Sequence, residues 1–215
     1  MTRNRQSTNV GDVAHGHPTD EQGRVLPECD WPADKAAPDG LEVIRRFCNT
    51  RNCENGADRF ETVESVRRWL HEQRLTAAVT ETDIDLDEPG RRRVVAVREH
   101  LRDHALAHHD GDDAAVPALD GWITDVRVAL VVDGGRLAVR PAGDDAADLM
   151  VGAVALAVLE AQRSDRWRRF KACPTCGWVF YDRSKNRSGR WCSMNACGGR
   201  AKVAAFRERR RDVEA

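Results

Sequence analysis

Four cysteines near the C-terminus have the spacing of metal ligands. Cys173 and Cys176 are separated by two residues. Cys192 and Cys197 follow as a second pair, with four residues between them. A Cys-x-x-Cys turn can direct two thiolates to one point, and Gly177 directly after it allows the backbone to fold back. The pattern predicts one zinc ion per chain, held by these four thiolates.

This zinc is expected to be structural. Four thiolates leave no open coordination position, so the metal would contribute folding energy to a segment too short to bury a large core. The alternative is a redox dithiol at Cys173 and Cys176, and the presence of a second cysteine pair argues against it. The sequence has no glycine-rich phosphate loop, nucleophile elbow or Ser-His-Asp order, so we expect no enzyme.

Positive charge is concentrated around the same cysteines. The whole chain carries 34 Lys and Arg against 35 Asp and Glu, but Arg163 to Arg211 contains 15 basic and only 3 acidic residues. A basic segment on an acidic body predicts a polyanionic partner at that end. A solvated charged surface is the simpler alternative.

The candidate nucleic-acid contacts are basic residues in the loop between the cysteine pairs and on the segment after them. We expect the loop residues to hold the phosphate backbone and Arg200 and Arg207 to contact bases or phosphates. The aromatic residues between them could stack on bases, but Phe180 and Trp191 are better explained as the small core of the module. The candidates are Arg183, Lys185, Arg187, Arg190, Arg200, Lys202, Arg207 and Arg211.

Short elements must position the cysteines. Residues 178–191 are expected to form two short strands around a Ser-, Asn- and Gly-rich turn. The following AKVAAFRERRR consists of good helix formers, with Cys197 in the first turn, where the helix dipole favours a thiolate. This order predicts a treble-clef-like or zinc-ribbon-like C-terminal module.

The preceding body is predicted to be mainly α-helical with one β-hairpin. Apolar residues recur at helical spacing near 41–48, in 61–75 with Thr62 as the cap, and in 88–109. RVALVV and RLAV flank Asp133 to Gly135, which predicts a hairpin. Residues 147–163 are apolar on nearly all sides and predict a buried helix.

Composition divides the chain into a disordered tail (1–38), a helical domain (39–165) and the zinc module (166–215). The sequence leaves open whether a continuous helix joins the last two. It contains neither the apolar run of a spanning helix nor a secretory signal, so we expect a cytoplasmic, nucleoid-associated protein without a membrane partner.

A histidine row forms a weaker constellation. His100, His104 and His108 recur every four residues and would align on one side of a helix. A metal site there is one interpretation. Solvated or interface histidines are the more common one, and we favour it.

The cysteine segment resembles the CGNR zinc finger. The resemblance covers about forty residues and includes Cys173–Gly177, Phe180, Asp182, Arg190–Met194 and Cys197–Lys202. In that family the finger follows an ABATE domain. The start of this domain resembles LEVIRRFCNT and ETVESVRRWLHEQRL, and Asn49, Thr50 and Trp69 stand where the pattern of the family has them.

The resemblance implies a bacterial, stress-induced transcription regulator with a C-terminal DNA-binding finger. The N-terminal domain would sense a small-molecule effector. Separately, a homodimer would be a natural partner arrangement, because a single finger usually binds weakly. This sequence departs from the family at Gly199, where Asn is usual. The alternative function is a zinc-containing module that docks on a protein or RNA without specific DNA binding.

Overall fold

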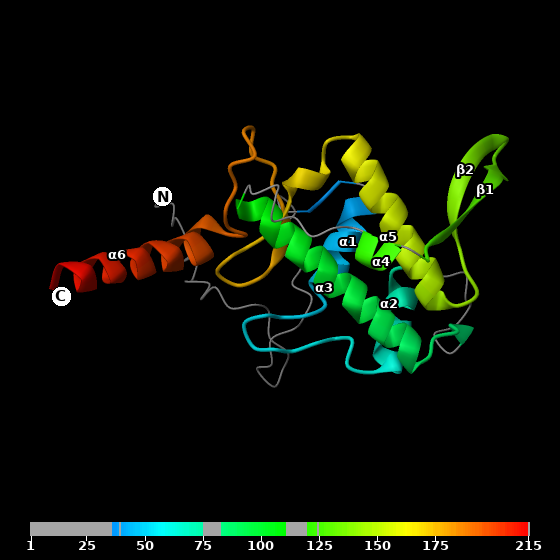
Figure 1. The fold of residues 1–215 in the computed structure, drawn as a ribbon, viewed down its shortest axis with the longest axis horizontal. Helices are drawn as coiled ribbons and strands as arrows, with labels where there is room; N and C mark the ends of the chain where they lie inside the picture. The colour runs from blue at the N-terminus through cyan, green and yellow to red at the C-terminus, as the bar shows by residue number, and fades with distance from the viewer. Residues whose placement is uncertain (1–35, 39, 75–82, 111–119, 124, 215) are drawn as a thin grey trace, which may run out of the picture.

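The structure, a computed structural model, describes residues 36–38, 40–74, 83–110, 120–123 and 125–214. The predicted disordered tail, 1–38, falls almost entirely outside these residues. The described chain is mainly helical, with one exposed hairpin and a small cysteine-rich module, which confirms the predicted fold class (Figure 1). The helices of the body are α1 (Gly40–Cys48), α2 (Val63–Glu72), α3 (Glu88–Asp110), α4 (Asp120–Ile123) and α5 (Ala146–Arg163).

Local signals account for where these helices begin. Thr62 caps α2: its side chain accepts a hydrogen bond from the Ser65 amide, and the Ser65 hydroxyl accepts one from the Thr62 amide. The Asp145 side chain caps α5 by accepting from the Asp148 amide at 2.8 Å. The predicted cap of α2 is therefore confirmed.

The core of the body lies between α1, α2, α3 and α5. Phe47, Phe60 and Trp69 form its aromatic centre, with ring centroids 5.5 to 5.9 Å apart. The predicted apolar stripe of α3 is buried against them. Helix α5 is less enclosed than expected, because Leu159 is 49% exposed.

The predicted hairpin is present. Strand β1 (Arg127–Asp133) pairs antiparallel with β2 (Arg136–Ala142). Gly134 and Gly135 join them with φ angles of 56° and 78°, and a two-residue turn of this kind needs positive φ at both positions. Strand β2 packs on α5, and the hairpin stands at the opposite end of the molecule from the C-terminal helix (Figure 1).

The structure shows how the C-terminal region is joined to the body, which the sequence left open, and it corrects one expectation for that region. No continuous helix leads into it, because α5 ends at Arg163, Asp165 has φ 55°, and the 3-10 turn η4 (Trp167–Arg169) follows. Strand β3 (Phe170–Ala172) pairs with β4 (Val179–Tyr181). The expectation of two strands within 178–191 is therefore wrong: β4 is the strand there, and its partner precedes Cys173.

The chain ends with the π-helical turn η5 (Met194–Gly198) and α6 (Gly199–Glu214). Helix α6 projects away from the body (Figure 1). None of the described helices is long and apolar enough to cross a membrane.

Candidate metal centre and nucleic-acid interface

The four predicted cysteines converge on one point. Their sulfur atoms lie within 4.8 Å of one another and all four residues are buried. The Sγ–Sγ distances are 3.5 Å between Cys176 and Cys192 and 3.6 Å between Cys192 and Cys197. Tetrahedral zinc with Zn–S bonds of about 2.3 Å requires sulfurs ~3.8 Å apart. The donor set therefore fits one zinc ion.

The thiols could not all ionise at this spacing without a cation. Hydrogen bonding to Cys173 and Cys176, together with burial, raises the pKa of Cys192. Hydrogen bonds from Cys176 and Cys192 instead lower the pKa of Cys173, so ionisation of one thiol opposes that of its neighbours. A bound divalent cation removes this opposition by neutralising the thiolates.

The first cysteine pair lies in the turn of the β3–β4 hairpin. The Gly177 amide donates to the Cys173 carbonyl at 2.7 Å, and the Cys173 amide donates to the Trp178 carbonyl at 2.9 Å. Gly177 has φ 70°, and a Cβ there would lie 2.8 Å from Cys53. Only glycine fits this position, where the chain must turn to bring Cys173 and Cys176 together.

The second pair is presented by the start of the C-terminal helix. Cys197 lies in η5, which begins after Ser193, whose side chain accepts a hydrogen bond from the Ala196 amide at 3.2 Å. Gly199, where the family has Asn, opens α6, and a Cβ there would meet no atom within 4 Å. The departure therefore removes a surface side chain and leaves the metal ligands unaffected.

A buried ion pair shapes the basic loop between the two cysteine pairs. Lys171 Nζ donates to Asp182 Oδ2 at 2.9 Å and to the carbonyls of Arg187 and Gly189. Asp182 also accepts from the amides of Ser184 and Gly189, each at 2.9 Å. Burial raises the pKa of Asp182, but the hydrogen bonds from Lys171 and Ser184 outweigh it and hold that pKa below its usual value. The loop is thus fixed from inside.

The predicted nucleic-acid contacts divide into two groups. Arg183 donates to the Ala36 carbonyl, Arg187 pairs with Asp165, and Arg200 pairs with Glu54 at 2.6 Å while also donating to Cys197 Sγ at 3.1 Å. These three arginines are engaged within the chain. The others are exposed, and they are Lys185, Arg190, Lys202, Arg207 and Arg211.

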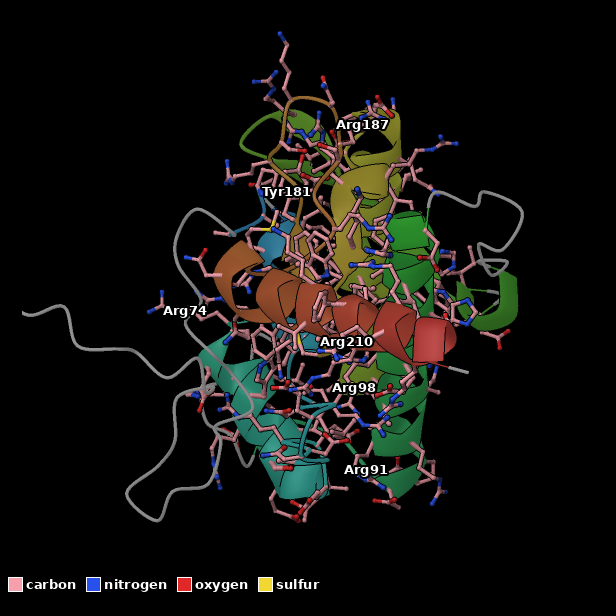
Figure 2. The ribbon with its side chains drawn as sticks, turned by 90° about the vertical axis from the view of Figure 1, so that its left-hand side faces the viewer. Arg74, Arg91, Arg98, Tyr181, Arg187 and Arg210 are labelled. Carbon is pink, nitrogen blue, oxygen red and sulfur yellow. The ribbon has the colours of Figure 1, made fainter. Side chains whose placement is uncertain are left out.

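The exposed group lies on two elements at one end of the molecule. Figure 2 looks onto this end, with α6 across the view and the loop that carries Arg187 above it. Trp178 and Phe180 are buried in the core of the module and Tyr181 in that of the body, so these three are not stacking surfaces for bases. The guanidinium of Arg190 lies 6.0 Å from the Trp191 ring.

Three polar side chains that the sequence analysis did not single out for this role connect the body to the module. The Asn49 side chain donates to the Val179 carbonyl and accepts from the Val179 amide, both at 2.9 Å. Arg102 donates to the Gly177 carbonyl at 2.9 Å and to the Cys48 carbonyl at 2.5 Å. Glu54 holds Arg200. Arg102 directly follows Leu101, which belongs to the buried stripe of α3. This position is the sequence signal that could have indicated a buried role for Arg102.

The histidine row lies at the same junction. His104 is buried, its ring centroid is 6.0 Å from that of Trp167, and His108 Nδ1 lies 3.0 Å from the Phe170 carbonyl. Among the described residues, the cysteines are the group placed to hold a metal, and the histidines are not part of it. The favoured interpretation of interface histidines agrees with this packing.

Comparison with known families agrees with the geometry. Residues 169–210 match the model of the CGNR zinc finger. Residues 42–164 match that of the ABATE family, whose description is "Putative stress-induced transcription regulator". No curated protein matches the chain. The two matches and the converging cysteines establish one structural zinc, and the chain belongs to the ABATE family with a C-terminal CGNR zinc finger.

Proposed function

We propose that the chain is a non-catalytic transcription regulator that binds DNA through its C-terminal end. The observation that carries the proposal is the exposed, basic helix α6, which projects from the body directly after the zinc ligand Cys197 (Figure 1). A structural zinc can fix the start of this helix, and the helix is then free to lie in or along a groove. Its charge exceeds what neutralisation of the metal site requires.

One face of α6 suits this role. Arg200, Ala204, Arg207 and Arg211 recur every three or four residues and therefore share a side of the helix. The small Ala204 allows close approach of a phosphate backbone between the arginines. Because Arg200 is engaged by Glu54 and Cys197, we propose that Arg207 and Arg211 make the principal contacts and that Arg200 holds the metal site. Lys202 is exposed on the opposite side of the helix, so it does not share this contact face.

The loop at 183–190 supplies a second contact. Lys185 and Arg190 are exposed on a backbone that Asp182 and Lys171 hold in one shape. A loop that is already ordered loses little conformational entropy when it binds. We propose that these two residues bind phosphates beside the groove that α6 occupies.

The test compares two double variants that remove the same charge. Arg207→Ala with Arg211→Ala should weaken binding of the zinc-loaded protein to duplex DNA, and the slope of log K against log salt should fall in magnitude by about 2. The control, Arg68→Ala with Arg92→Ala, removes two exposed arginines from helices of the body and should leave both quantities unchanged. Zinc content should be the same in both. Equal affinity of the two variants would reject the role of α6.

The competing function is docking of the finger on an acidic protein or on RNA. This function also requires a positively charged surface, but it predicts that nonspecific duplex DNA does not displace the partner from the finger. We favour DNA because of the family description and the projecting helix.

An apolar cavity supports the expected effector. It has a volume of about 190 Å³ between α1 and α5 and is lined by side chains that include Phe47, Trp69 and Met150. We propose that a small apolar molecule binds here. Titration with indole should give saturable binding that Ala153→Phe abolishes, and equal binding by the two proteins would place the indole elsewhere.

A further inference from the structure

The β1–β2 hairpin presents an uncovered apolar face. Side chains alternate along each strand, and the register pairs Leu130 with Val139, Val132 with Leu137, and Val128 with Pro141. All of these side chains therefore lie on one side of the ribbon. The five large ones are 45–78% exposed, whereas Leu41, Ile44 and Phe47 in helix α1 and Trp69 and Leu70 in α2 are buried.

The hairpin is anchored firmly enough to present this face. At its base, a Cβ on Gly152 of α5 would lie 3.0 Å from Pro141, so the strand and the helix are in close contact. Arg127 pairs with Asp144 at 2.8 Å and with Asp148 at 2.6 Å. A two-stranded ribbon is marginal in water without such support. Pro141 makes this contact at the base of the apolar face, and beyond it the five large side chains of that face are exposed.

The chemistry of the face favours a partner identical to itself. Every side chain on it is apolar, and two of the nearby arginines are paired within the chain, Arg140 with Asp133 and Arg127 with Asp144. An acidic or basic partner would gain nothing from such a surface. A two-fold interface places the same patch on both sides, so an uncharged apolar face is complementary to its own copy.

The exposed area of the apolar hairpin face is also large enough to form the centre of a dimer interface. The five side chains expose roughly 500 Å² of apolar surface, at the upper end of the ~300–600 Å² of the largest patch on a typical monomer. A stable dimer buries about 800 Å² per partner, with an apolar centre and a polar rim. The face thus supplies the centre of such an interface.

We propose that the chain forms a two-fold homodimer in which the apolar hairpin faces of two copies pack against each other. The hairpin and α6 lie at opposite ends of the molecule, so this dimer leaves both basic helices accessible (Figure 1). The interface does not depend on the proposed DNA binding. Two fingers on one duplex would nevertheless bind more tightly than one.

The test is the mass of the full, zinc-loaded chain in sedimentation velocity over a range of concentrations. The wild-type protein should sediment at twice the chain mass of 24.0 kDa. Leu130→Glu with Leu137→Glu should halve that mass at unchanged zinc content and helicity, because both side chains are exposed in the monomer. Phe206→Glu is the control: it changes an exposed apolar residue on α6 and should leave the dimer intact.

Three results would overturn the proposal. They are a wild-type monomer at every concentration, a dimer that survives both hairpin substitutions, and a dimer that Phe206→Glu dissociates. If the hairpin variant misfolds, hydrogen exchange on the wild-type protein still tests the interface. Amide hydrogen exchange in 127–142 should slow as concentration rises, and exchange that is independent of concentration would also contradict the interface.

Discussion

The side chain of Asn49 joins the helical body to the zinc module by replacing a strand partner for Val179. Its two hydrogen bonds, both 2.9 Å, satisfy the buried amide and carbonyl of that residue. Asn49→Ala leaves both groups unsatisfied, so we predict that the free energy of unfolding falls by about 2–4 kcal/mol. Denaturant unfolding of the zinc-loaded protein measures it.

Asn49→Asp is the matched variant. It keeps an acceptor for the Val179 amide but loses the donor to the carbonyl, and it should be less stable than the wild type. A loss in Asn49→Ala below about 0.5 kcal/mol would mean that the two bonds do not hold the module in place.

His104 makes stability depend on pH. Burial, with the nearby His100 and His108, lowers the pKa of His104 to about 4. The unfolded chain has a histidine pKa of about 6.5, so protons favour unfolding, and stability is full above this value and falls as pH drops toward 4. Between about pH 7.5 and about pH 5.5 we predict a loss on the order of 1 kcal/mol from this residue.

His104→Leu isolates the effect, because it removes this titration and leaves His100 and His108. The difference in unfolding free energy between wild type and variant should change over that pH range, and zinc content is measured at each pH because thiolate–zinc binding is itself pH-dependent. A difference that is constant with pH would show that His104 is not the source.

The residues of the site were predictable where the signal is local. Cysteine spacing was sufficient to identify four ligands within twenty-five residues of one another. Asn49 binds a residue 130 positions away, and Arg102 binds one 75 positions away, so no spacing in the sequence connects them. The same applies to Glu54, which reaches across to Arg200 and so limits the role predicted for that arginine.

At the scale of the elements, the shape of the loop at 183–190 depends on the carboxylate of Asp182. Asp182 accepts from Lys171, Ser184 and Gly189 and so fixes the backbone that carries Lys185 and Arg190. We predict that Asp182→Ala weakens DNA binding about tenfold at unchanged zinc content, because the loop must then be ordered during binding. Fluorescence anisotropy with labelled duplex DNA measures the affinity.

Asp165→Asn is the control for this loop. It weakens the exposed pair with Arg187 without touching the buried contacts, so it should change affinity little. If the two variants bind DNA equally well, the shape of the loop is not set by Asp182.

Periodicity predicted the helices of the body because each has an apolar stripe that packs on the core. It failed for the strands of the module, which have three residues each, too few for a repeating pattern. The β3–β4 pairing follows from the turn at Cys173 to Gly177, which brings the strand before the first cysteine beside the strand after it.

At the scale of the molecule, the β3–β4 hairpin of the zinc module is part of the core of the body, while the cysteines, Trp178 and Phe180 form a second cluster. Phe170 and Val179 belong to the same buried cluster as Leu101 and Val154, and β3 packs on α3. We predict that removal of zinc by a chelator lowers the melting temperature of the whole chain and that added zinc restores it. Calorimetry tests this, and an unchanged transition of the helical body would contradict the shared core.

The two ends of the molecule differ in surface chemistry. One end carries the apolar hairpin face, and the other carries the basic side chains of α6 and the neighbouring loop. The family match and the single zinc are consistent with a regulator of this design. DNA binding by the basic end is the central claim.

That claim is tested most directly by titrating labelled duplex DNA with the zinc-loaded protein at several salt concentrations. The account predicts binding that weakens steeply as salt rises and that unlabelled nonspecific duplex displaces at low salt. Absence of binding at low salt, in protein with one zinc per chain, would contradict it and identify the finger as a module that docks on another kind of partner.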